Sequence, residues 1–240
     1  MNTLKFENKG KIKMIAHRGL SGLERENTCP AFVAAGVKSY YGIETDVHVT
    51  KDKKHIIIHD DDLKAIAGLD TVVRESEYPD LRKVRLTDTD GKTKREDLFL
   101  PSLPEYLSIC KKYGKEAVLE LKEEMAEEDV VSIAGAVEEM GMMENTTFIS
   151  FYPNNLLYLR RAYPSASAQF LADAPREEVV KFILDNNLDA DIYYEYVTKE
   201  FIDLMHENGR VVNVWTVDTV ADAERVKELG VDMITSNILE

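Results

Sequence analysis

The sequence has little of several features that would each indicate a particular kind of protein. It has only two cysteines, Cys29 and Cys110, and their spacing matches no metal-binding motif. One disulfide is possible, but two buried thiols suit a large cytosolic protein better. No apolar run approaches the length of a membrane span, and the charged stretch 1–14 lacks the apolar centre of a secretory signal. We therefore expect a soluble, cytoplasmic protein without a membrane anchor.

Positive charge is also scarce. The 240 residues include 30 lysines and arginines against 44 aspartates and glutamates, so the formal net charge is -14. Such a balance argues against nucleic acid or an anionic membrane surface as a partner. An anionic substrate would need cations placed locally in its binding site. Hydrophobic residues, at 44%, suffice for the core of a single domain over 1–240.

Two carboxylates lie close together in a stretch where apolar and polar residues alternate. Because the alternation covers 42–50, Glu44 and Asp46 point to the same face of a strand. After a turn, a second apolar run ends in His59. Taken alone, this stretch is equally compatible with an exposed hairpin whose acids are solvated, so its role depends on the rest of the chain.

Strand-like and helix-like segments alternate along the chain. Between 61 and 100 no period is sustained, and we expect an insertion of irregular structure with at most one short helix. Eight strands alternating with helices favour a (β/α)8 TIM barrel, with the insertion after the second strand and its hairpin. The alternative, an open doubly wound sheet, would need a glycine-rich first loop, and the first predicted loop does not have the required glycine spacing. The expected strands are 12–16, 42–50, 116–122, 147–151, 167–171, 190–194, 211–216 and 233–235, and the expected helices are 28–39, 102–113, 128–140, 154–162, 176–186, 199–208 and 221–229.

Three acids should meet at the mouth of such a barrel, because the C-terminal ends of its strands form one face. They are Glu44, Asp46 and Glu120. Three like charges in one concavity repel one another unless a cation neutralises them. Oxygen-only ligation favours Mg²⁺ or Ca²⁺, with Mn²⁺ possible.

Two histidines and two cations are expected at the same mouth. Histidine is the side chain best suited to proton transfer near neutral pH, so His17 and His59 suggest one acid and one base. Arg18 and Lys122 supply the local positive charge that a phosphate would need. Trp215 also ends a strand, although a single inward aromatic residue is usually part of a core.

Several short motifs occur in a fixed order along the chain. They are HRG at 17–19, ENT at 26–28, IETDVHVTKD at 43–52, HD at 59–60, LPSLPE at 100–105, LELK at 119–122, SF at 150–151 and VNVWTVD at 212–218. Together they resemble the glycerophosphodiester phosphodiesterase family over about residues 12–238. The resemblance implies a barrel with an inserted segment and hydrolysis of a glycerol phosphodiester to glycerol phosphate and an alcohol. By similarity, Glu44, Asp46 and Glu120 would hold the metal, His17 and His59 would transfer protons, Arg18 and Lys122 would contact the phosphate, and Trp215 would flank the glycerol.

Some positions depart from the family pattern. Ser236 and Asn237 stand where an acidic Thr-Asp pair is more usual, and Arg25 stands where a proline often precedes the ENT motif. We expect none of these departures to touch the proposed acids or histidines.

The sequence leaves several functions open. A metal-dependent phosphodiesterase for small, water-soluble glycerophosphodiesters is favoured. A lysophospholipid substrate would need an apolar lip, for which the insertion offers Leu63, Ile66, Leu69, Val72 and Val73. A barrel aldolase would use Lys122 as a Schiff-base lysine, but the neighbouring Glu120 would keep that lysine charged. A non-catalytic binding module is disfavoured because all three acids and both histidines are present.

Overall fold

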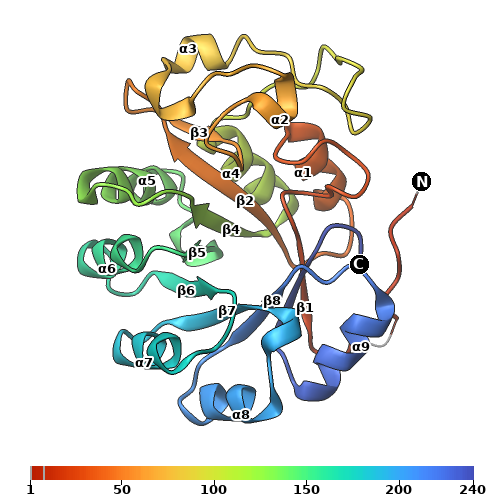
Figure 1. The fold of residues 1–240 in the computed structure, drawn as a ribbon, viewed down its shortest axis with the longest axis vertical. Helices are drawn as coiled ribbons and strands as arrows, with labels where there is room; N and C mark the ends of the chain where they lie inside the picture. The colour runs from red at the N-terminus through yellow and green to blue at the C-terminus, as the bar shows by residue number, and fades with distance from the viewer. Residues whose placement is uncertain (1, 8) are drawn as a thin grey trace.

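A computed structural model describes residues 2–7 and 9–240, in which parallel strands form a closed ring surrounded by helices (Figure 1). Within these residues the sheet order is β1-β9-β8-β7-β6-β5-β4-β2-β3, and the pairing of β1 with β2 closes the ring. The predicted (β/α)8 barrel is thereby confirmed. Its parallel strands are β1 (Lys13–Ala16), β2 (Gly42–Val49), β4 (Glu116–Leu121), β5 (Thr146–Ser150), β6 (Ser167–Ala172), β7 (Asp189–Tyr193), β8 (Val212–Trp215) and β9 (Met233–Ser236).

Local sequence signals explain where several of the outer helices begin and end. Thr28 caps α1, because its side chain accepts a hydrogen bond from the backbone of Ala31. Ser102 and Glu105 form the predicted capping box of α4, and Gly114 ends that helix in the left-handed conformation, at φ 61°. The longer helices are α1 (Cys29–Gly36), α4 (Leu103–Tyr113), α5 (Glu127–Glu139), α6 (Pro153–Ala162), α7 (Glu177–Asp185), α8 (Lys199–Glu207) and α9 (Val220–Leu229), with single 3-10 turns at η2 (Met143–Asn145) and η3 (Tyr194–Tyr196).

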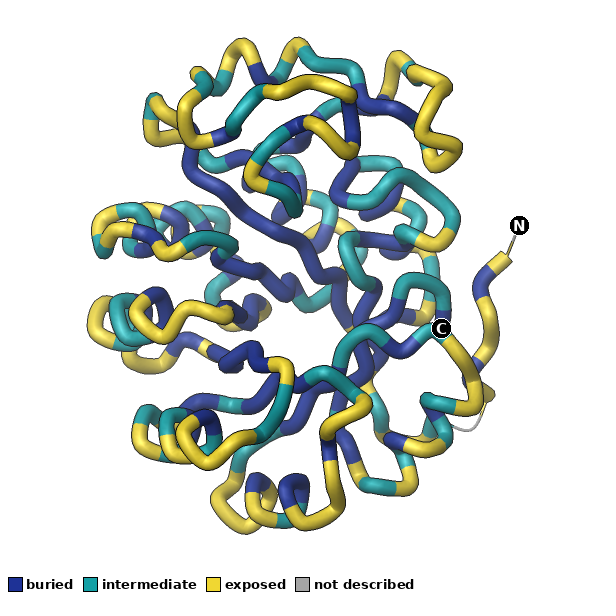
Figure 2. The backbone as a smooth tube through the Cα atoms, in the orientation of Figure 1, coloured by how far each residue is buried: buried dark blue, intermediate teal, exposed yellow. Residues whose placement is uncertain are grey.

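The barrel strands are the most deeply buried part of the chain, whereas the helices expose their outer faces (Figure 2). All eight residues of β2 are buried, including the acids Glu44 and Asp46. Burying ionised groups costs free energy unless they are paired or bind a cation. The apolar core therefore holds a group of charges that require partners.

The hairpin and the insertion form a small region with its own core beside α1 and α4 (Figure 1). β3 (His55–Ile57) pairs antiparallel with β2, and the insertion contains α2 (Lys64–Ala67), η1 (Val73–Glu75) and α3 (Tyr78–Leu81). The expectation of at most one short helix is wrong. Helices of four residues are too short to show a periodic pattern in sequence. The core of this region comprises Ile56, Ile58, Leu63, Ile66, Ala67, Val73, Leu81, Leu86, Leu98 and Leu100.

Most of the residues predicted to form an apolar lip are buried in this core instead. Leu63 and Val73 are fully buried, and Ile66 is 8% exposed. These side chains pack within the core of the insertion, so little of their apolar surface is available to a substrate. Leu69, at 41% exposed, is the one member of the predicted set with a largely exposed side chain among the described residues.

Two further expectations about the chain can be compared with the structure. Among the described residues, no helix combines the length and the apolar character that crossing a membrane requires. Cys29 and Cys110 are free thiols, the first half-buried and the second buried, so the disulfide alternative is wrong.

Candidate active site

The three predicted acids converge on two neighbouring strands, at the level where β1 ends. Glu44 and Asp46 lie on β2, and Glu120 lies on β4, where it is the register partner of Asp46. One carboxylate oxygen from each residue lies within 4.8 Å of the other two. The side-by-side parallel strands thus produce the cluster that the spacing on β2 predicts.

Burial and mutual repulsion disfavour ionisation of all three acids at the same time. Burial, followed by the charges of Asp46 and Glu120, raises the pKa of Glu44 well above its usual range. Burial and the charge of Asp46 raise the pKa of Glu120 to about 8. Burial also acts on Asp46, but Lys122 and Arg18 outweigh it and lower its pKa to about 2. The group needs more positive charge than its surroundings supply.

The donor set fits a hard divalent cation. Asp46 Oδ1 and Glu120 Oε1 are buried and accept no hydrogen bond from the described residues, although Lys122 Nζ lies 3.5 and 3.0 Å from them. Carboxylate oxygens with free lone pairs are the ligands that Mg²⁺ and Ca²⁺ prefer. The acidic cluster could therefore hold a metal ion, as the sequence predicts.

Arg18 is tied to the acids through both its backbone and its side chain. Its backbone N–H donates to Glu44 Oε2 at 2.7 Å, and its Nε lies 3.7 Å from Asp46 Oδ2. Glu26 accepts a hydrogen bond from the guanidinium at 2.9 Å. The residue has a left-handed φ of 53°, an uncommon conformation outside glycine that is often found at functional sites. With Lys122, it places two cations at the edge of the acidic cluster.

His17 approaches the acids with its Nε2 atom, which lies 4.0 Å from Glu44 Oε2. Its Nδ1 lies 2.8 Å from Asn237 Oδ1. Asp218 accepts hydrogen bonds from the backbone N–H and from the Nδ2 of Asn237, at 2.8 and 2.6 Å. These contacts orient the amide, so the oxygen of Asn237 faces the ring and Nδ1 must carry the hydrogen. In the neutral ring, Nε2 then has its lone pair toward the acids.

Sequence reasoning missed Asn237, and its expectation that the departures from the family pattern touch no histidine is wrong. Asn237 lies 220 positions beyond His17, and only the closure of the barrel brings the two together. The site around His17 also disfavours a charged ring. Burial, followed by the charge of Arg18, lowers the pKa of His17 to about 4.

His59 has a different partner from His17. Its Nδ1 lies 2.7 Å from Asp60 Oδ1, so a carboxylate, not an amide, holds the ring. The buried His48 lies behind it, with Nε2 3.3 Å from the carbonyl oxygen of His59. Asn27 donates to Asp46 Oδ2 at 2.7 Å, which supports a positioning role for the residues around the ENT motif.

A cavity of about 100 Å³ joins these groups at the barrel mouth. Seven of the eight predicted site residues line it, and the eighth, Asp46, lies within the acidic cluster. The ring of Trp215 meets that of Phe151 edge to face, with centroids 5.6 Å apart. The lining residues are His17, Arg18, Glu44, His59, Glu120 and Lys122 on the polar side, and Ile149, Phe151, Leu171, Asp191, Trp215, Thr216 and Thr235 on the other.

Asp191 is the second residue that sequence reasoning missed. It lies on β7, 2% exposed, and burial followed by the charge of Glu120 raises its pKa well above the usual range. The available signal was the pair Asp189 and Asp191, two positions apart at the start of a predicted barrel strand. Fold and site together thus define a TIM barrel whose mouth contains an acidic cluster that could hold a metal ion, with two cations beside it.

Comparison with known proteins agrees with this class. A glycerophosphodiester phosphodiesterase of Bacillus altitudinis is 26% identical over 230 residues, which cover 92% of this chain and 93% of the relative. A structure assigned to a glycerophosphoryl diester phosphodiesterase of Silicibacter pomeroyi matches with a TM-score of 0.87 and 25% identity, over 95% of this chain and 90% of that one. An Oleispira antarctica phosphodiesterase, solved with sn-glycerol-3-phosphate, matches with a TM-score of 0.81 and 21% identity, over 94% and 92% of the two chains.

The sequence pattern of the glycerophosphoryl diester phosphodiesterase family matches residues 17–240. The chain therefore belongs to this family of enzymes, and the resemblance seen in the sequence is confirmed.

Proposed function

We propose that this enzyme hydrolyses glycerophosphodiesters to glycerol 3-phosphate and an alcohol, using one divalent cation, Mg²⁺ or Ca²⁺, with Mn²⁺ possible. The observation that carries the proposal is the convergence of Glu44, Asp46 and Glu120 within 4.8 Å, next to Arg18 and Lys122. The sn-glycerol-3-phosphate bound to the Oleispira protein supports the same substrate class.

The proposed binding mode matches the charge of the substrate to the charge of the site. A phosphodiester carries one negative charge, and Arg18 and Lys122 offer guanidinium and ammonium donors to its oxygens. Held by the three acids, the cation would polarise a phosphoryl oxygen and stabilise the charge that develops there. The acidic surface of the protein, with its net charge of -14, remains unsuited to other large anions.

We assign the base to His17 and the acid to His59. A neutral His17 has a lone pair on Nε2, because Asn237 holds the hydrogen on Nδ1, so it can accept a proton from the attacking water or hydroxyl. His59 has its Nδ1 paired with the Asp60 carboxylate, which orients the ring so that Nε2 can deliver a proton to the leaving alcohol. Each such transfer is worth about 10²- to 10⁴-fold in rate.

Small, water-soluble substrates suit this cavity. It has a volume of about 100 Å³ and adjoins a hollow of about 340 Å³ that shares His59, Glu120 and Lys122, so the glycerol phosphate and a short polar leaving group have room. A lysophospholipid remains the second candidate, because Phe151 and Tyr152, each 38% exposed, offer aromatic surface beside the cavity. Glycerophosphocholine, glycerophosphoethanolamine and glycerophosphoglycerol are the favoured substrates.

Release of glycerol 3-phosphate from these three compounds, measured with and without a chelator, tests the proposal. We expect release that stops on chelation and returns when Mg²⁺, Ca²⁺ or Mn²⁺ is added. No release from any of the compounds with any of the metals, or full activity after exhaustive chelation, would contradict it.

A further inference from the structure

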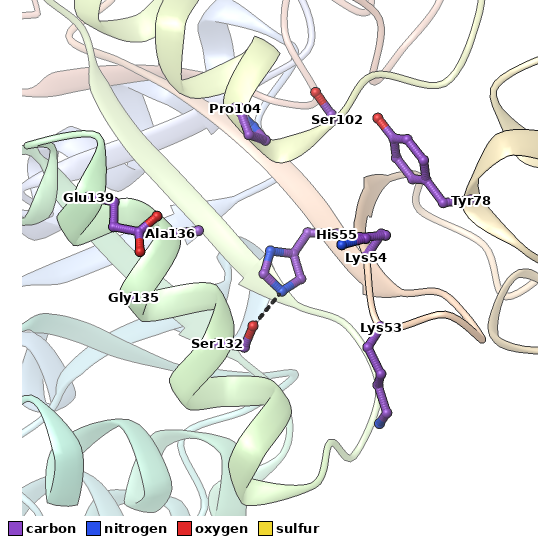
Figure 3. Close-up of a pocket in the computed structure, with 10 residues that line it drawn as sticks. All are labelled: Lys53, Lys54, His55, Tyr78, Ser102, Pro104, Ser132, Gly135, Ala136 and Glu139. Atoms are coloured by element: carbon purple, nitrogen blue, oxygen red, sulfur yellow. Dashed lines mark hydrogen bonds between the residues drawn. The ribbon is translucent and has the colours of Figure 1, made fainter.

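A wide hollow on the described surface lies outside the barrel, between the β2–β3 hairpin and the helices α4 and α5 (Figure 3). It has a volume of about 560 Å³. His55 is hydrogen-bonded to Ser132 there, at 3.1 Å, and Lys53 binds Asp129 at 2.8 Å. Among the described residues, no side chain that lines this hollow has a buried polar atom without a partner. Nothing in its chemistry therefore calls for a ligand.

The smaller cavity at the barrel mouth does contain such a group. Asp191 lines it, is 2% exposed, and has an Oδ1 atom that makes no hydrogen bond to the described residues. The side chain of Asn213, its register partner, lies close enough to Asp191 to oppose the rise in the pKa of Asp191. However, its Nδ2 donates to Gln169 and Thr235, at 3.4 and 3.2 Å, and Oδ1 of Asp191 is left without a partner in the described part of the chain. A buried polar atom without a partner destabilises a protein, so it calls for an explanation.

Asp191 does not belong to the proposed metal site. It is not a member of the one cluster of potential metal ligands found among the described residues, which contains Glu44, Asp46 and Glu120. It lies instead on the side of the cavity formed by Leu171 and Trp215, and its own carbonyl oxygen accepts a hydrogen bond from Trp215 Nε1 at 3.3 Å. Among the described residues that line this side there is no lysine or arginine to bind a phosphate, so the side suits the carbon skeleton of a substrate.

We propose that the carboxyl group of Asp191 binds a free hydroxyl of the glycerol moiety and makes the site selective for glycerol over simpler alcohols. This inference rests on the proposed function. A hydroxyl both donates and accepts hydrogen bonds, so it satisfies the carboxyl in either protonation state. A site built to bind a hydroxyl rejects the analogue that lacks it, because its own polar group is then left buried without a partner.

The test compares three substrates: glycerophosphoethanolamine, 2-hydroxypropyl phosphoethanolamine and 3-hydroxypropyl phosphoethanolamine. Each analogue lacks one of the two glycerol hydroxyls. We expect Asp191→Leu to lower kcat/KM for glycerophosphoethanolamine by about 10- to 100-fold. For one analogue the same substitution should change kcat/KM by less than about threefold, because the hydroxyl that Asp191 binds is already missing.

Gln169→Leu is the matched control. Gln169 is also a buried polar residue inside the barrel, 2% exposed, but it does not line the cavity. We expect it to affect the three substrates equally or not at all. An equal loss on all three substrates with Asp191→Leu would assign Asp191 a structural role and overturn the inference, as would no loss on any of them.

Two further outcomes keep this test separate from the test of the proposed function. If the wild-type protein cleaves none of the three compounds, the proposed function fails. If it cleaves them but Asp191→Leu lowers kcat/KM equally for all three, only the inference fails.

If Asp191→Leu does not fold, a crystal structure of the wild-type protein with glycerol 3-phosphate decides. It should show a glycerol hydroxyl about 2.5–3.0 Å from a carboxylate oxygen of Asp191. Glycerol hydroxyls bound entirely by other groups would overturn the inference.

Discussion

The two sides of the barrel mouth are built from opposite kinds of side chain. The side formed by β1, β2 and β4 carries the charged groups of the site: His17, Arg18, Glu44, Asp46, Glu120 and Lys122. The side formed by β5 to β8 carries mainly apolar groups, Ile149, Phe151, Leu171 and Trp215, with the single acid Asp191.

This difference indicates that the two sides of the cavity have different functions. On the charged side, close acids and cations shift one another's pKa values, as a site that binds a cation and transfers protons requires. On the apolar side, shape and one buried acid, Asp191, are available to select the substrate. Substitutions on the first side should therefore abolish turnover, whereas substitutions on the second should change which substrate is preferred.

The largest expected effect is on the charged side, from Glu120→Gln. Loss of one carboxylate should remove most of the bound metal and several kcal/mol of transition-state stabilisation, about 10⁴-fold in kcat/KM. Metal content by elemental analysis and kcat/KM measure the two effects. Glu116→Gln, at the other end of β4, is the control and should keep its metal. A Glu120→Gln protein with normal metal content would contradict the assignment.

Substitution of the two histidines tests their different roles on the charged side. His17→Ala and His59→Ala should each lose about 10²- to 10⁴-fold with a poor leaving group. A p-nitrophenyl leaving group needs no protonation, so it should restore activity to His59→Ala but not to His17→Ala. His206→Ala, on the outer helix α8, serves as the control. Rescue of His17→Ala alone would reverse the two roles.

Trp215→Ala tests the apolar side. We expect a loss of up to about tenfold, mainly as a higher KM, because the ring contributes packing and no charge. A fall in kcat with unchanged KM would place Trp215 in the chemical step instead.

The choice between substrates tests the same side of the cavity. The wild-type protein should prefer glycerophosphocholine to its monoacylated counterpart, because the predicted lip is largely buried in the insertion. The ratio of the two kcat/KM values measures this preference. A strong preference for the acylated compound would overturn the proposal of a soluble substrate.

The last prediction is about stability, not turnover, and concerns Asp191. Its pKa is raised in the folded protein, so the folded state keeps a proton that the unfolded chain releases above about pH 4. Stability is therefore full below that pH and falls as the pH rises, by at most about 1.4 kcal/mol per pH unit. Asp191→Asn cannot ionise, so its stability relative to wild type should increase from pH 4 to pH 7 in urea unfolding. A difference that does not change with pH would contradict this.

Several parts of the site could be determined from the sequence alone. The alternation on β2 puts Glu44 and Asp46 on one face whatever the surroundings, because side chains in a strand repeat every two residues. The regular succession of strands and helices then determines the barrel, and the barrel brings the strand ends that carry Glu120 and His17 to one mouth.

Other parts were decided only by the tertiary structure. No local pattern links His17 to Asn237, because β1 and β9 meet only when the ring closes. No local pattern identifies Asp191 either, because its burial and its position in the cavity depend on the whole barrel. The buried core of the insertion likewise depends on contacts between residues as distant as Ile56 and Leu100. Sequence periodicity tells which face a side chain occupies, but burial and neighbours across the barrel determine its hydrogen bonds, its pKa and hence what it can do.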